Sequence, residues 1–154
     1  TAAVMGYGKV GFPTAFYLRG AGIKIVAISD FEGGIVNREH GLNPEEVFKH
    51  RQKTGSVVGF KEADSLTNKE LLELPVTILV PAATQSVITE ENAPKVKARI
   101  LAEAANAPTT IPAISILNEN GTFIIPDILC NAGASHPGRG QAEDERARGC
   151  LELG

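Results

Sequence analysis

Residues 2–11 read Ala-Ala-Val-Met-Gly-Tyr-Gly-Lys-Val-Gly and join a short apolar run to the pattern G-x-G-x-x-G. The run predicts a buried strand, and the glycines predict the turn that leads from it into a helix. Gly6 would permit the tight turn, Gly8 would let a pyrophosphate approach the backbone, and Gly11 would allow close packing of helix and strand. The N–H groups and partial positive charge of the helix start would then bind the phosphates. The predicted phosphate-binding residues are Gly6, Gly8, Lys9, Val10 and Gly11.

A second apolar run, residues 24–29, ends in Asp30, which follows Gly11 by nineteen residues. This spacing is typical of the acid that binds the adenosine ribose of a dinucleotide. A carboxylate here would accept hydrogen bonds from both ribose hydroxyls and would repel a 2′-phosphate. Glu32 adds negative charge, and the sequence has no Arg or Lys between Asp30 and Asn37. We therefore expect NAD as the cofactor, with NADP disfavoured. The alternative role for Asp30 is an Asx-turn in the loop.

Apolar runs with little alternation recur along the chain and predict short strands that are buried on both faces. They span residues 2–5, 24–29, 76–80, 99–102 and 122–125. Helix starts lie between them, at residues 43–46 (Asn-Pro-Glu-Glu) and 67–70 (Thr-Asn-Lys-Glu). Residues 20–22 (Gly-Ala-Gly) would end the first helix, and Pro13 would bend it if the helix began near residue 9. Alternating strands and helices predict a single α/β domain with a doubly wound, mostly parallel sheet.

The composition bounds the class of protein. The 154 residues argue for one domain, with 43% hydrophobic and 21% charged residues. No apolar run is long enough to span a membrane, and a net charge of −3 gives no reason to expect nucleic-acid binding. Two cysteines and no secretory signal favour a cytoplasmic protein, in which Cys130 is expected to be a buried thiol. The cysteines and histidines have no metal-ligand spacing. Because the sequence begins at Thr1, we expect a chain cut from something longer, or processed.

Seven stretches resemble, in order, the cofactor domain of glutamate dehydrogenase. They are residues 26–35, 55–60, 67–74, 78–83, 88–93, 105–110 and 126–133. Over residues 1–134 the chain is thus similar to the superfamily of glutamate, leucine, phenylalanine and valine dehydrogenases. The resemblance implies a dinucleotide-binding Rossmann domain at residues 1–134. Residues 135–154 are polar, depart from the family, and are expected to be a disordered tail, with a short charged helix at 141–148 as the alternative.

The resemblance also implies cofactor contacts beyond the glycine motif. Ala82 and Ala83 would lie on the adenosine side, with Thr84 at the edge of that site, and Phe31 is a further predicted cofactor-binding residue. Asn106 and Asn131 would approach the nicotinamide end, through its ribose and carboxamide. Such residues follow apolar strands, at the edge of the sheet where doubly wound folds bind ligands. The alternatives are a strand-end cap for Asn106 and a helix cap for Asn131.

Two residues depart from the family pattern, which has glycine where this sequence has Ala107 and Ala134. Either Cβ would crowd the nicotinamide or sit in a turn that prefers a positive φ. The resemblance places the catalytic lysine and aspartate on an amino-terminal substrate domain that this sequence does not contain. We therefore expect a domain that binds the dinucleotide for hydride transfer but is inactive alone. The alternatives are a decayed nucleotide-binding fold that acts as an assembly module, and one chain of a split enzyme completed by a substrate-domain chain. The chain could also form a homo-oligomer.

Overall fold

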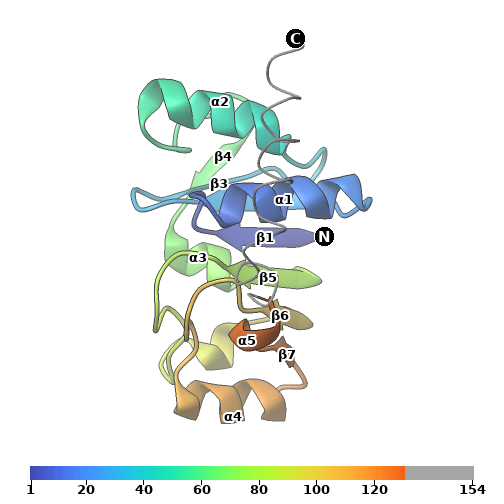
Figure 1. Cartoon of the computed structure of the whole chain (residues 1–154), viewed down its shortest axis with the longest axis vertical. Coiled ribbons are helices and arrows are strands. Elements are labelled where there is room, and N and C mark those ends of the chain that lie inside the picture. Colours follow the sequence, from blue (N-terminus) through green and yellow to red (C-terminus); the bar gives the residue numbers. More distant parts are fainter. Residues whose placement is uncertain (131–154) are drawn as a thin grey trace, which may run out of the picture.

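The computed structural model describes residues 1–130 and places seven strands in one sheet, in the order β4-β3-β2-β1-β5-β6-β7 (Figure 1). The strands are β1 (Ala2–Met5), β2 (Ile25–Ser29), β3 (Gly34–Val36), β4 (Asp64–Leu66), β5 (Ile78–Pro81), β6 (Ile100–Ala102) and β7 (Phe123–Ile125). Five of them, β1, β2, β5, β6 and β7, are parallel, and β3 is antiparallel to both β2 and β4. The predicted fold class and the five predicted strands are confirmed.

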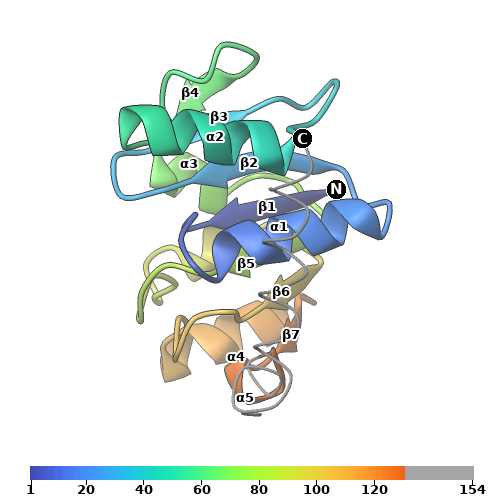
Figure 2. The same cartoon turned by 45° about the horizontal axis from the view of Figure 1, so that its top comes forward.

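Helices cover both faces of this sheet, as Figures 1 and 2 show. They are α1 (Gly11–Gly20), α2 (Pro44–Thr54), α3 (Asn68–Leu72), the 3-10 helix η1 (Ala93–Lys95), α4 (Ile111–Glu119) and α5 (Asp127–Cys130). Neighbouring residues of a strand belong to different cores: Ala3 packs in the cluster that includes residues of α3, η1 and α4, whereas Val4 packs in the cluster that includes residues of α1 and α2. This burial on both faces explains why the central strands read as continuous apolar runs.

The predicted helix signals match the observed caps. The side chain of Asn43 accepts the Glu45 N–H at the start of α2, and Thr67 and Glu70 form a reciprocal capping box on α3. Because α1 begins at Gly11, Pro13 lies in its first turn and removes no internal hydrogen bond, so the reason for the expected bend is gone. Gly22, with φ of +86°, closes α1 as predicted.

Some sequence predictions lie outside the described residues, among them the contact of Asn131 and the tail at 135–154. Within residues 1–130, none of the helices has the length and apolar character needed to cross a membrane. The prediction of a buried Cys130 is wrong, because this thiol is exposed at the end of α5. Burial of part of the group and the nearby Glu103 and Asp127 carboxylates nevertheless raise the pKa of Cys130, so the thiol stays protonated at neutral pH.

Candidate cofactor-binding site

The carboxyl ends of the parallel strands meet at one edge of the sheet, which we call the carboxyl edge. It comprises the loops that follow β1, β2, β5 and β6, at residues 6–10, 30–33, 82–87 and 103–110. From β1 the chain crosses to β2 on one side, and it later returns to β5 on the other side of β1. Doubly wound sheets bind ligands outside the strand ends at this kind of switch point. Most of the predicted site residues lie here.

Two glycines of the motif are required by the fold itself. Gly6 has φ of +95°, and a Cβ on it would lie 2.7 Å from the Ala83 nitrogen and 2.8 Å from the Ala82 carbonyl carbon. A Cβ on Gly11 would overlap the Gly6 carbonyl oxygen. The tight turn predicted at Gly6 and the close packing predicted at Gly11 are therefore present.

Gly8 differs from both of its partners in the motif. It is exposed, its φ is not positive, and among residues 1–130 no atom lies within 4 Å of the position its Cβ would take. The backbone at residue 8 therefore does not require the conformational freedom of glycine. Lys9 is exposed as well, and the Val10 side chain is 45% exposed. This loop presents an open face that the described part of the protein leaves uncovered.

The start of α1 is suited to an anion. No side chain in the described chain caps its first turn, and that turn contains no acidic residue. By contrast, α2 begins with the Asn43 cap and two glutamates. The Phe12 N–H donates to the Gly8 carbonyl at 3.2 Å and Pro13 has no N–H, so the positive end of the helix dipole, with the N–H groups of the loop before the helix, would favour a phosphate beside Gly8 and Lys9. The phosphate-binding role of residues 6–11 stays a prediction.

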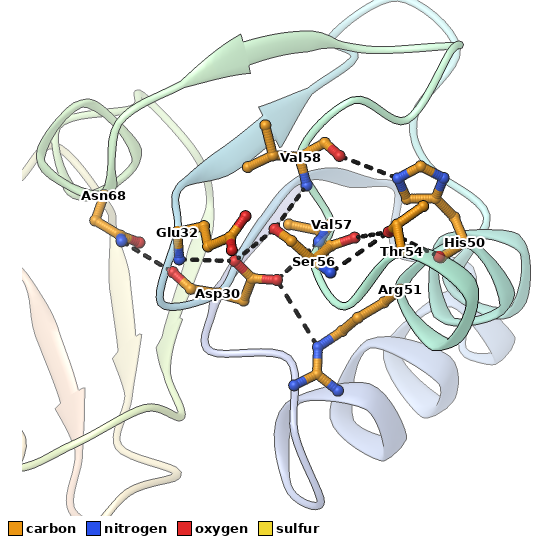
Figure 3. Close-up of polar contacts among 9 residues, drawn as sticks. All are labelled: Asp30, Glu32, His50, Arg51, Thr54, Ser56, Val57, Val58 and Asn68. Carbon is orange, nitrogen blue, oxygen red and sulfur yellow. Dashed lines mark hydrogen bonds and ion pairs between the residues drawn. The ribbon is translucent and has the colours of Figure 1, made fainter.

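Asp30 lies directly after β2, as predicted, but its carboxylate is turned into the protein (Figure 3). Oδ1 accepts the Glu32 N–H at 3.0 Å and the Ser56 hydroxyl at 3.1 Å, and Oδ2 accepts the Val57 N–H at 2.7 Å. The side chain is only 3% exposed. The bond from Glu32 makes the Asx-turn that was the alternative role for Asp30. These three donors already bind the carboxylate within the protein. A direct hydrogen bond from Asp30 to a ribose stays a prediction.

Arg51, on the last turn of α2, is a residue that the sequence analysis missed. Its Nε lies 3.8 Å from Asp30 Oδ2 and is buried without a hydrogen-bond partner among the described residues, while the side chain as a whole is 30% exposed. Arg51 lies twenty-one residues beyond Asp30, well outside the span from Asp30 to Asn37 that has no Arg or Lys. The sequence does contain a signal for Arg51, because it is a basic residue in the last turn of the helix that starts at residues 43–46. Its charge offsets part of the negative field of Asp30 and Glu32.

The segment that holds Asp30 is itself fixed by hydrogen bonds (Figure 3). The Thr54 hydroxyl donates to the Ser56 carbonyl at 2.8 Å, and Ser56 Oγ accepts the Val58 N–H at 3.1 Å. His50 Nε2 lies 3.0 Å from the Val58 carbonyl oxygen, and Asn68 Nδ2 donates to the Asp30 carbonyl at 2.9 Å. The end of β2 is thus held from both sides, and the exposed Phe31 and Glu32 follow it.

The loops after β5 and β6 complete the carboxyl edge. Ala82 and Ala83 lie against Gly6, so the predicted adenosine-side residues border the glycine motif, and Ala83 and Thr84 are exposed. Asn106 is also exposed, and Ala107 has φ of +42°. The turn with positive φ expected at this departure from the family pattern is therefore confirmed. Within residues 1–130, no group of three or more His, Cys, Asp or Glu side chains could hold a metal ion.

The comparisons with known proteins agree with this geometry. The family model described as Glutamate/Leucine/Phenylalanine/Valine dehydrogenase matches residues 1–135. The chain is 50% identical over 133 residues to a glutamate dehydrogenase of Aeropyrum pernix, and 44% identical over 130 residues to an NADP-specific glutamate dehydrogenase of Saccharolobus shibatae. These alignments cover 86% and 84% of this chain but only 32% and 30% of the relatives. The chain thus spans about a third of the length of the curated relatives it matches.

A solved structure extends the likeness to the fold. The hetero-hexameric glutamate dehydrogenase from Thermus thermophilus, in its Leu-bound form, matches with a TM-score of 0.78 at 29% identity. The match covers 86% of this chain and 31% of that one. The resemblance inferred from the seven sequence stretches is confirmed by these findings. This chain belongs to the Glutamate/Leucine/Phenylalanine/Valine dehydrogenase family.

Proposed function

We propose that the chain is the cofactor-binding part of a glutamate dehydrogenase-like amino-acid dehydrogenase and holds NAD or NADP across the carboxyl edge. The pyrophosphate would lie on the open face of Gly8 at the start of α1, and the adenosine would lie between the loops after β2 and β5. The nicotinamide would lie beside Asn106, where, once bound, it would exchange a hydride with the α-carbon of an amino acid.

The geometry of Gly8 carries this proposal. Gly6 and Gly11 are needed for the turn, but a Cβ on Gly8 would touch nothing in the described protein. A glycine that the fold does not require, in front of a helix start without a side-chain cap, has the arrangement of a phosphate cradle. A side chain at residue 8 would contact no described protein atom and would occupy only the space that the phosphates of the ligand need.

Substitution of Gly8 tests the proposal. Gly8→Val should abolish NADH binding, measured by isothermal titration, while leaving the circular dichroism spectrum and the urea midpoint close to those of the unmodified chain. The matched control is Gly20→Val, because Gly20 also has open space around its Cβ position but lies at the opposite end of α1. Unchanged affinity in the folded Gly8 variant would mean that any ligand binds elsewhere.

For the cofactor, we propose NAD in preference to NADP by at least about tenfold. Asp30 is buried but its charge, with that of exposed Glu32, would still repel a 2′-phosphate, whereas Arg51 would attract it. Asp30→Ser should therefore narrow the ratio of the two dissociation constants, and Arg51→Gln should widen it. Equal dissociation constants on the unmodified chain would contradict the preference.

We also propose that the chain alone does not oxidise glutamate. Amino-acid oxidation needs a cation for the substrate carboxylate and a base for the amine proton, each held about 3 Å from its target. The family resemblance places both groups on a substrate domain. The assay is NADH formation with glutamate, with and without a candidate substrate-domain chain. Sustained NADH formation by the purified chain, lost in Asn131→Ala, would show an enzyme in its own right.

The second candidate function is an assembly module whose nucleotide site has decayed. The observation that favours it is Ala107, which occupies a left-handed turn at the proposed nicotinamide end. Under this alternative, neither NADH nor ADP-ribose binds to the unmodified chain. Titration with both ligands therefore separates the two functions.

A further inference from the structure

The strain of the described backbone is concentrated at one end of the carboxyl edge. Among residues 1–130, only two non-glycine residues have a positive φ, Ser86 at 54° in the loop after β5 and Ala107 at 42° in the loop after β6. A hydrogen bond connects these two residues, because the Ser86 N–H donates to the Ala107 carbonyl at 3.0 Å. Strained backbone of this kind persists where its surroundings hold it, and it tends to occur at functional sites.

Asp127 is the side chain that holds this turn. Its Oδ2 accepts the Ala107 N–H at 2.9 Å. That N–H belongs to the peptide that joins Asn106 to Ala107, so the bond fixes the plane of this peptide and with it the direction of the Asn106 main chain. A hydrogen bond to a carboxylate is stronger than one to a neutral acceptor, so the charge of Asp127 strengthens its hold on this turn.

Asp127 is in turn fixed from the next strand. Its own N–H donates to Glu103 Oε2 at 3.2 Å, and Glu103, which directly follows β6, is 6% exposed. The Glu103 N–H donates to the carbonyl of Ile125, the last residue of β7. Two parallel strands therefore set the position of the Asp127 carboxylate under the loop that carries Asn106.

We propose that Asp127 is a positioning residue for the nicotinamide half of the cofactor. It would act through the Asn106–Ala107 peptide, without touching the cofactor, and would leave the adenosine and pyrophosphate contacts unaffected. The inference rests on the proposed function. It predicts a defect confined to ligands that contain a nicotinamide.

The test compares NADH with ADP-ribose, which shares every part of the dinucleotide except the nicotinamide. In the full 154-residue chain, Asp127→Ala should weaken NADH binding about tenfold while changing ADP-ribose binding less than about twofold. The fluorescence maximum of NADH at saturation should also move toward that of free NADH. Asp127→Asn keeps an acceptor oxygen at the same reach and should restore most of the NADH affinity.

Each remaining outcome decides against the inference. Equal losses of affinity for NADH and for ADP-ribose in Asp127→Ala would show that Asp127 acts only in folding. The control is Asp127→Ser, a smaller change at the start of α5, which should then show the same equal losses. Unchanged NADH binding in Asp127→Ala would show that the turn does not depend on the acceptor at residue 127. If the unmodified chain binds NADH and ADP-ribose, these results overturn the inference alone. If it binds neither, the proposed function fails and the inference fails with it.

Discussion

Ala107 offers a direct test of the backbone geometry at the carboxyl edge, because its φ is +42° although it carries a Cβ. In the left-handed region that Cβ costs about 1–2 kcal/mol, a cost that glycine does not have. Glycine also makes the unfolded chain more flexible, which opposes the gain by about 0.4–1 kcal/mol. The side chain is exposed, so little packing is lost. Ala107→Gly should therefore raise the free energy of unfolding by about 0.5–1 kcal/mol.

Urea denaturation followed by circular dichroism measures this change. With a slope of about 1–2 kcal/mol per molar urea, the midpoint should rise by about 0.25–1 M. The matched control is Ala105→Gly, two residues earlier, where φ is not positive and only the cost of flexibility remains. The midpoint of this control should fall. A fall of the same size in Ala107→Gly would refute the left-handed geometry at residue 107.

Two further predictions concern the structures that support the site. The Tyr7 hydroxyl donates to the Pro44 carbonyl at 2.6 Å, and burial, with the nearby Glu45 carboxylate, raises the pKa of Tyr7 and keeps the phenol protonated. Tyr7→Phe should therefore lower the free energy of unfolding by about 1–2 kcal/mol, and an unchanged urea midpoint would contradict this bond. Hydrogen bonds from Thr67 lower the pKa of Glu70, so the stability that this carboxylate contributes is present above its ordinary pKa and is lost as pH falls through the lowered one. The difference in urea midpoint between the unmodified chain and Glu70→Gln should close over that acid range, and a pH-independent difference would show that the charge is not involved.

The central sheet could be predicted because its strands are buried on both faces and contain almost no polar residues. The strands β3 and β4 were missed for two different reasons. Each has three residues and pairs antiparallel, but β3 is buried and too short to stand out as an apolar run, whereas β4 at the sheet edge is largely exposed. Pattern analysis detects longer runs of buried residues, so it finds neither a buried strand of three residues nor an exposed edge strand.

The glycine motif shows which structural features a local sequence pattern can predict. The turn at Gly6 and the packing at Gly11 follow from sterics between residues that are close in sequence, so the motif predicts them well. The positive φ at residue 107 could be anticipated because alanine stands where the family has glycine. The hydrogen bond from Ala107 to Asp127 could not, because it joins the loop after β6 to the first residue of α5, which follows β7.

The spacing between the glycine motif and Asp30 predicts where this acid lies but not which way its carboxylate points. The motif locates this acid correctly after β2, but the partners that decide which way its carboxylate turns are Ser56 and Val57, from a loop beyond the next helix. The helix before that loop, α2, brings the Arg51 Nε within 3.8 Å of Asp30 Oδ2 at the same time. The electrostatic balance toward a 2′-phosphate is thus set by two acids and one cation that the fold brings together, and by carboxylate burial that no local pattern reports. Under the proposed function, cofactor preference would therefore depend on α2 and the loop after it as well as on the acid after β2.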